Sequence, residues 1–347
     1  MIKKTKAAIL YELNKPLKIE ELKLPRLEHG QVLVKVMASG VCHSQLNEIE
    51  GKKGPDKYLP HLLGHEGAGV VEEISDGVTK VKPGDHVVLT WIKGRGLDRP
   101  SSTYLDGDTV INSGAISTFS EFTVVSENRV VPISRDMPFD NAALLGCAVP
   151  TGAGIVFNTI KPKSGSSIAV FGVGGIGASA LIAAKTAGCG IIIAVDIHEF
   201  KLQAAKKMGA SVMINAAKDD VTSAIMDLTG GQGIDYAIEA AGLKQTMEQA
   251  FVSVKDNGGL LVIAGNLSQG QKISIDPFDL IKGKRIIGSW GGQTLPDEDI
   301  PKYVNLYLEE KLKIDELITH RFSLDEINDA FRALKTGDNV LRIILEC

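Results

Sequence analysis

The sequence has few of the features that mark secreted, membrane or nucleic-acid-binding proteins. Only four of its 347 residues are cysteine, too few for a disulfide framework, which predicts a reducing, cytoplasmic location. The first apolar run, residues 7–10, is too short for a signal peptide or a membrane span. The net charge of −4 gives no reason to expect nucleic acid or an anionic membrane as a partner.

The remaining composition is that of an ordinary globular chain, with 44% hydrophobic and 23% charged residues and a length sufficient for two domains. Short strand-like runs separated by Gly, Pro and Asp predict a β-rich, barrel-like domain over residues 1–148. From residue 149 strands alternate with helices, which predicts a doubly wound parallel sheet over 149–289. The tail, 290–347, is expected to return to the first domain, and the polar stretch 93–113 is predicted as a loop.

The clearest motif lies between residues 167 and 201. An apolar run at 168–171 leads into Gly172-Val173-Gly174-Gly175-Ile176-Gly177, followed by a helix-like segment and a second apolar run at 191–195. In such a motif the first glycine allows a tight turn, the second lets the backbone approach a pyrophosphate, and the last lets helix and strand pack closely. Asp196 then stands where an acid meets the adenosine ribose and repels a 2′-phosphate. The motif therefore predicts NAD rather than NADP.

Three candidate metal ligands lie outside that segment: Cys42, His65 and Cys147. Two thiolates and an imidazole suit zinc, and three protein ligands leave a fourth position for water or substrate. No two of them form a C-x-x-C pair. Spacing alone therefore leaves open that the cysteines are small buried hydrophobic residues and that the histidine belongs to a loop.

The residues around these ligands resemble the zinc-containing medium-chain alcohol dehydrogenases. The matching words cover essentially the whole chain: Gly-Val-Cys-His-Ser at 40–44, Gly-His-Glu-Gly-Ala-Gly-Val-Val at 64–71, Val-Lys-Pro-Gly-Asp-His-Val at 81–87, Gly146-Cys147 and the glycine turn. The resemblance implies an α/β fold in which a Rossmann domain interrupts a GroES-like catalytic domain. It also implies hydride transfer between NAD and a primary or secondary alcohol, or its aldehyde or ketone.

The resemblance further implies roles for individual residues. Cys42, His65 and Cys147 would hold a catalytic zinc that polarises the substrate oxygen, with Glu66 beside the metal or as an alternate ligand. Ser44 would receive the alcohol proton and relay it through the cofactor ribose. The remaining implied positions are Lys201 near the adenosine ribose, Thr151 near the nicotinamide, Arg342 near the pyrophosphate and Trp91 in the alcohol pocket. A turn hydrogen bond for Ser44, a core position for Trp91 and a solvated position for Arg342 are the alternatives.

Three departures from the family pattern change the expected site. Gln45 replaces an aspartate that usually orients the ligating histidine, so we expect a more electropositive or less tightly held zinc. Asn47 replaces a histidine that ends the proton relay in many members, so we expect the last step to use water or His43. No cysteine lies between His86 and Phe119, where many members hold a structural zinc, which predicts one zinc per subunit.

Other readings stay open at this point. A polyol or sugar-alcohol dehydrogenase shares the fold, although its third protein ligand is commonly glutamate rather than a cysteine such as Cys147. A catalytically inactive nucleotide-binding relative is supported only by the departures. The strand at 285–289 is an expected sheet edge, which predicts a homodimer or homotetramer. The lysine pair at 52–53 and the histidines without a motif, His61 among them, are predicted to be solvated or to lie in loops.

Overall fold

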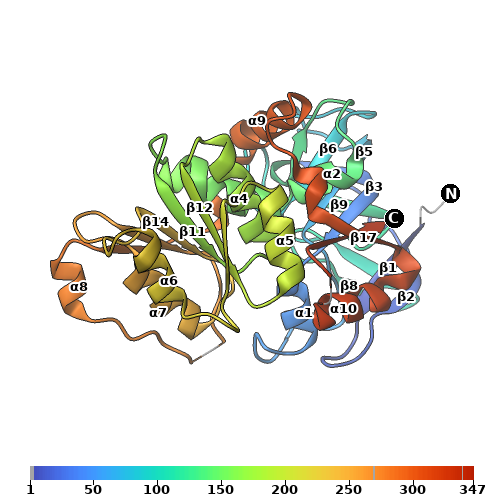
Figure 1. The fold of residues 1–347 in the computed structure, drawn as a ribbon. Helices are drawn as coiled ribbons and strands as arrows, with labels where there is room; N and C mark the ends of the chain where they lie inside the picture. The colour runs from blue at the N-terminus through green and yellow to red at the C-terminus, as the bar shows by residue number, and fades with distance from the viewer. Residues whose placement is uncertain (1–3, 269, 338) are drawn as a thin grey trace. The chain divides into compact units, whose positions relative to one another are not determined.

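The computed structural model describes residues 4–268, 270–337 and 339–347. The chain forms two compact units (Figure 1). The barrel unit contains the chain up to Cys147 together with 295–309 and 318–347, and the sheet unit contains 148–294 and 310–317. The sequence prediction assigned all of 290–347 to the first domain, whereas in the structure 290–294 and 310–317 belong to the sheet unit, and 310–317 is the longer of these segments. There Leu312, Ile314 and Leu317 are fully buried, and η4 (Ile314–Leu317) packs on α4 (Gly175–Thr186) of the sheet unit.

The barrel unit combines a closed five-stranded barrel, in the order β1-β2-β7-β8-β4, with a seven-stranded sheet. That sheet has the order β10-β6-β5-β3-β18-β17, and β9 pairs with β3. Its elements before Cys147 are β1 (Lys4–Leu10), β2 (Lys18–Lys23), β3 (Gln31–Val41), α1 (His43–Ile49), β4 (His61–Leu62), β5 (Glu66–Ile74), β6 (His86–Thr90), β7 (Thr103–Asp106), β8 (Thr109–Asn112), β9 (Phe122–Ser126), η1 (Glu127–Arg129), β10 (Val130–Pro132) and α2 (Phe139–Leu144). Those after residue 294 are α9 (Pro296–Leu308), β17 (Ile318–Ser323), η5 (Leu324–Glu326), α10 (Ile327–Thr336) and β18 (Arg342–Glu346).

The prediction of an unbroken loop over residues 93–113 is wrong for its second half. Strands β7 and β8 form a hairpin that completes the barrel, joined by a turn in which Gly107 has a φ of 55°. Tyr104 and Ile111 point into the barrel core and are fully buried, whereas Leu105 and Val110 are exposed. This alternation is the period of two that a half-buried hairpin requires, and the polar residues around it concealed the pattern.

The first half of that stretch is held by a single buried carboxylate. Glu127 is 2% exposed, and it accepts backbone N–H groups from Thr79 at 2.6 Å, Lys80 at 2.8 Å and Leu97 at 2.8 Å. Such charge-assisted bonds to a buried carboxylate are among the stronger hydrogen bonds in proteins. Glu127 therefore ties the 93–99 segment to the sheet.

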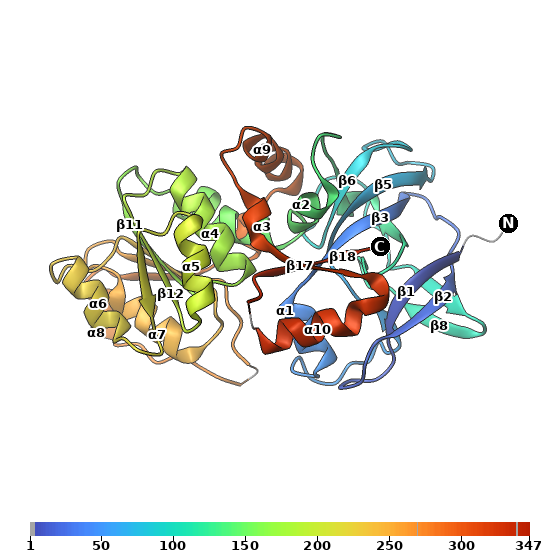
Figure 2. The same cartoon turned by 45° about the vertical axis from the view of Figure 1, so that its right-hand side comes forward.

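Strand β3 is the centre of the barrel unit, because it pairs with β5, β9 and β18. Its partner β18 comes from the far end of the sequence, with Val41 opposite Ile343 and Ala38 opposite Glu346. Helix α10 also comes from the far end of the sequence and lies beside α1 (Figure 2). Lys335 of α10 forms an ion pair with Glu50 at 2.7 Å.

The sheet unit is the doubly wound parallel sheet predicted from the sequence. Its six strands are all parallel and have the order β13-β12-β11-β14-β15-β16. The direction of winding reverses between β11 and β14, and such a switch point is where sheets of this kind bind ligands. The elements are α3 (Ala148–Gly154), η2 (Ile155–Ile160), β11 (Ser167–Phe171), α4, β12 (Ile191–Asp196), α5 (Glu199–Lys207), β13 (Val212–Asn215), α6 (Val221–Leu228), β14 (Tyr236–Glu239), α7 (Lys244–Ser253), β15 (Leu260–Ile263), α8 (Pro277–Ile281), β16 (Arg285–Gly288) and η3 (Gly291–Gln293). No helix within the described ranges is both long and apolar enough to cross a membrane.

Candidate metal centre and nucleotide site

The three predicted metal ligands come together in the barrel unit. Cys42 follows β3 and precedes α1, His65 immediately precedes β5, and Cys147 follows α2. Their ligand atoms all lie within 4.8 Å of one another. Residues separated by more than a hundred positions thus form one cluster of two thiols and an imidazole, a donor set that suits zinc.

The histidine has one nitrogen engaged and one available. Its Nδ1 contacts the amide nitrogen of Gln45, a side chain that is only 2% exposed. The Nε2 of His65 is buried, and it has no hydrogen-bond partner in the part of the chain that the structure describes. A buried nitrogen that lacks a hydrogen-bond partner and lies beside two thiols fits a metal ligand, because buried polar atoms are otherwise hydrogen-bonded.

The electrostatics of the cluster favour thiolate ligands. A hydrogen bond from Cys147 holds the pKa of the Cys42 thiol well below its usual value, against the opposing effect of burial. His65 and Arg342 lower it further. Thiolates, not thiols, bind zinc, so the cluster is prepared for a cation.

A buried ion pair supports the cluster. Glu66 is fully buried, Arg342 is 3% exposed, and the two side chains form an ion pair. A Cβ atom at Gly40 would lie 2.6 Å from the Glu66 carboxyl carbon, so the glycine makes room for this carboxylate. The alternative of a solvated position for Arg342 is wrong, and its contact with a pyrophosphate stays a prediction.

The glycine turn has the shape that a dinucleotide site requires. Gly172 adopts a φ of +92°, and a Cβ atom at Gly177 would lie 1.9 Å from the Gly172 carbonyl oxygen, so helix α4 packs directly on the turn. A Cβ atom at Gly174 would meet no atom within 4 Å, so this position is open. Gly174 caps α4, and Gly175 begins it, which leaves the N–H groups of the first helical turn available to an anion.

Asp196 ends β12 next to this turn. Its carboxylate accepts the Val173 N–H at 2.8 Å and the His198 N–H at 3.0 Å, and it lies 2.9 Å from Nδ1 of His198. Lys201 is half-buried in the first turn of α5. In the sheet unit Thr151 is buried within α3, and in the barrel unit His43 is exposed at the start of α1. Trp91 is half-buried after β6, and its carbonyl accepts a bond from Arg129.

Comparisons with known proteins agree with this geometry. Residues 28–135 match the model of the alcohol dehydrogenase GroES-like domain, and residues 175–309 match the model of zinc-binding dehydrogenases. The class-3 alcohol dehydrogenase of Zea mays is 36% identical over 368 residues, covering 98% of this chain and 96% of the relative. The chain belongs to the zinc-containing medium-chain alcohol dehydrogenases. It is a zinc-dependent alcohol dehydrogenase.

Solved structures resemble the enzyme along its whole length. An alcohol dehydrogenase zinc-binding domain protein from Burkholderia ambifaria superimposes with a TM-score of 0.93 at 32% identity, covering 100% of this chain and 99% of that one. The benzyl alcohol dehydrogenase of Acinetobacter calcoaceticus gives a TM-score of 0.91 at 32% identity, with 99% of each chain covered. Both the barrel unit and the sheet unit are therefore those of this family.

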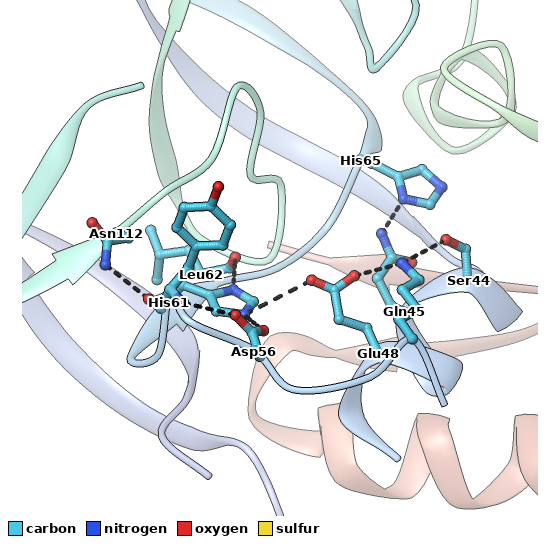
Figure 3. Close-up of polar contacts among 10 residues, drawn as sticks. Ser44, Gln45, Glu48, Asp56, His61, Leu62, His65 and Asn112 are labelled. Atoms are coloured by element: carbon cyan, nitrogen blue, oxygen red, sulfur yellow. Dashed lines mark hydrogen bonds and ion pairs between the residues drawn. The ribbon is translucent and has the colours of Figure 1, made fainter. Parts of the chain in front are cut away.

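The sequence reasoning missed a second polar cluster in the enzyme, formed by Glu48, Asp56 and His61 (Figure 3). The prediction of a loop or surface position for His61 is wrong, because His61 starts β4 and is 6% exposed. Its Nε2 lies 2.8 Å from Asp56 Oδ2 and 3.8 Å from Glu48 Oε1. The available signal was the segment Pro55 to Pro60, in which two prolines restrict the chain between the acid and the histidine.

Proposed function

We propose that the enzyme holds one catalytic zinc with Cys42, His65 and Cys147. We further propose that it uses NAD to interconvert primary or secondary alcohols and their aldehydes or ketones. The buried, unpartnered Nε2 of His65 beside two thiols carries this proposal. The metal, when bound, supplies a Lewis acid for the substrate oxygen, and the nicotinamide supplies the hydride acceptor.

The protein's own groups prepare this chemistry. Cys42 and Cys147 present thiol groups to one point, and the charge of Arg342 favours the thiolate form of Cys42. Glu66 compensates the buried charge of Arg342, because an unpaired charge at that depth would be unstable. Ser44, in the first turn of α1, is the hydroxyl proposed to receive the alcohol proton.

Zinc content tests the metal centre. We expect one zinc per subunit in protein purified without added metal or chelator, because no cysteine lies between His86 and Phe119 to build a second site. Cys147→Ser should lose that zinc. Cys189→Ser is the matched control, because Cys189 is a half-buried free cysteine of the sheet unit, and it should keep the zinc. Two zinc ions per subunit, or zinc retained without Cys147, would contradict the proposal.

The choice of NAD rests on Asp196. Its carboxylate is anchored by the Val173 N–H beside the glycine turn, so a negative charge is fixed where a 2′-phosphate would be repelled. Asp196→Ser should improve the ratio of kcat/KM for NADP over NAD by at least about tenfold. An unchanged ratio would show that Asp196 does not select the cofactor.

A second copy of the chain is the proposed partner at the edge of the sheet unit. Strand β16 pairs with β15 and ends the sheet, and α8, which precedes β16 in the chain, exposes 57% of Phe278 and 77% of Ile281. An open edge next to apolar side chains favours pairing with an identical edge. Light scattering should show a homodimer or a multiple of it, and Ile281→Asp should weaken it. A monomeric wild-type enzyme would contradict this proposal.

A cytoplasmic location stays a prediction.

A further inference from the structure

The proton-transfer path at Ser44 is incomplete as the sequence presents it. This point rests on the proposed role of Ser44 as the hydroxyl that receives the alcohol proton. Asn47 stands where a titratable side chain would continue the path, and a carboxamide neither takes up nor releases a proton near neutral pH. Another group that contacts Ser44 and assists the departure of its proton would compensate for Asn47.

That group is Lys53, whose ammonium donates to two oxygens of α1. Its Nζ lies 3.3 Å from Ser44 Oγ and 2.7 Å from Glu48 Oε2. Lys53 follows α1 in the sequence and returns to the helix, so a positive charge lies directly against the Ser44 hydroxyl. Both lysines at 52–53 are exposed, as predicted, and Lys53 contacts Ser44 from this exposed position.

The cluster of Glu48, Asp56 and His61 holds this lysine in place. Glu48 lies between Ser44 and the pair formed by Asp56 and His61 (Figure 3). The His61 ring is buried, and its Nδ1 lies 2.9 Å from the Leu62 carbonyl oxygen. The half-buried Glu48 carboxylate contacts His61 through one oxygen and accepts a hydrogen bond from the Lys53 ammonium with the other.

The neighbouring lysine shows that this arrangement is specific. Lys52 Nζ pairs with Glu50 Oε2 at 2.6 Å, and Lys335 pairs with the other oxygen of Glu50. Lys53 has a similar exposure, 50% against 58% for Lys52, so the difference between the two lysines lies in their partners and not in their burial. The charged and titratable groups that face Lys53 are accordingly Glu48 and, beyond it, Asp56 and His61.

We propose that Lys53 is a positioning residue for proton transfer at Ser44. The Lys53 ammonium occupies one lone pair of Ser44 Oγ and leaves the other for the alcohol proton. During alcohol oxidation, with the bound nicotinamide as hydride acceptor, the alcohol O–H proton would pass to Ser44 Oγ, and the original Ser44 proton would leave to water. Lys53 neither gains nor loses a proton. Its positive charge favours the departure of the Ser44 proton to water, so Lys53 acts through Ser44.

Three variants test this role through the pH profile of alcohol oxidation. In Lys53→Met, which keeps the side-chain length and removes the charge, we expect kcat at pH 7 to fall about tenfold and the profile to move upward by about one pH unit. Lys53→Arg keeps the charge and should restore most of the rate and the original profile. Lys52→Met removes the adjacent charge, which does not reach Ser44, and should match the wild type.

The outcomes separate this inference from the proposed function. Zinc content and NADH affinity should be the same in all variants, because the hydrogen bonds of Lys53 go to Ser44 and Glu48 and not to a metal ligand. A wild-type enzyme without turnover would defeat the proposed function before any variant is compared. A wild-type enzyme that turns over, with an unshifted profile in Lys53→Met, would overturn only the role of Lys53. Equal shifts in Lys52→Met and Lys53→Met would also overturn it, because surface charge alone would then explain the effect.

Discussion

Replacing Gln45 with glutamate should tighten zinc binding, because the two side chains have the same length but different hydrogen-bonding ends. Gln45 Oε1 accepts the Cys42 backbone N–H at 3.3 Å, so its amide nitrogen is the end that faces Nδ1 of His65. A ring nitrogen that faces a donor must present a lone pair, which places the proton of the neutral ring on Nε2. That is the buried nitrogen a metal ion needs unprotonated.

The expected size of the change in zinc affinity follows from the hydrogen bonds of Gln45 that zinc binding would alter. For Nε2 to lose its proton, Nδ1 must carry one, and the amide of Gln45 must turn its oxygen toward His65. Its NH2 group then faces the Cys42 N–H, and a buried donor left without an acceptor costs about 1–3 kcal/mol. A glutamate at position 45 accepts from both donors. We therefore expect Gln45→Glu to raise zinc affinity about ten- to hundredfold.

The assay is competition for zinc with a chromophoric chelator at neutral pH, which reads metal affinity without turnover. Asn47→Asp is the matched control, because it adds the same charge to the same helix two residues further along. We expect its zinc affinity to change by less than about threefold. Equal tightening in both variants would assign the effect to charge alone, and no tightening in Gln45→Glu would refute the tautomer argument.

Three further predictions concern the loop, the relay and the glycine turn. Three backbone N–H groups hold the pKa of Glu127 below its usual value although burial acts the other way, so its stabilisation is present above the unfolded-state pKa and is lost as pH falls through the folded-state pKa. Glu127→Gln should lower the free energy of unfolding by about 2–3 kcal/mol at neutral pH and reduce its dependence on acid, measured by urea denaturation; an unchanged acid dependence would contradict this. Asn47→His should raise activity at lower pH, and an unchanged pH profile would count against a missing relay group. Gly177→Ala should weaken NADH binding measured by fluorescence, because its Cβ would lie 1.9 Å from the Gly172 carbonyl oxygen; retained affinity would show that the turn adapts.

The sheet unit was the part of the fold most open to prediction. Buried parallel strands such as β11 and β12 read as continuous apolar runs, and the glycine turn between β11 and α4 has one main structural interpretation. The barrel unit was harder to predict in detail. Strands β4 and β7 are short, and β7 and β8 pair through a turn within a polar stretch whose composition resembles a loop. Their strand conformation depends on pairing with β1 and β2, which local sequence does not report.

The functional site could likewise be predicted only in part from the sequence. The metal ligands and the glycine turn could be proposed from short motifs. The contact of Lys53 with Ser44 could not, because it depends on how the segment after α1 turns back. The burial of His61 is likewise set by its place at the start of β4 and its pairing with β1. A motif gives the residue types within one segment, whereas these contacts depend on how several segments lie relative to one another in three dimensions.

The pairing of β3 with β18 orders the events of biosynthesis. All six strands of the sheet unit are translated before residues 342–346, so the Rossmann sheet can form while β3 still lacks β18. Pairings this distant close a very long loop and are expected to form late. Arg342, which supports the metal centre, sits in the same late strand. Metal loading is thereby coupled to the synthesis of β18, because a chain that stops before β18 would lack both a strand of the barrel-unit sheet and Arg342.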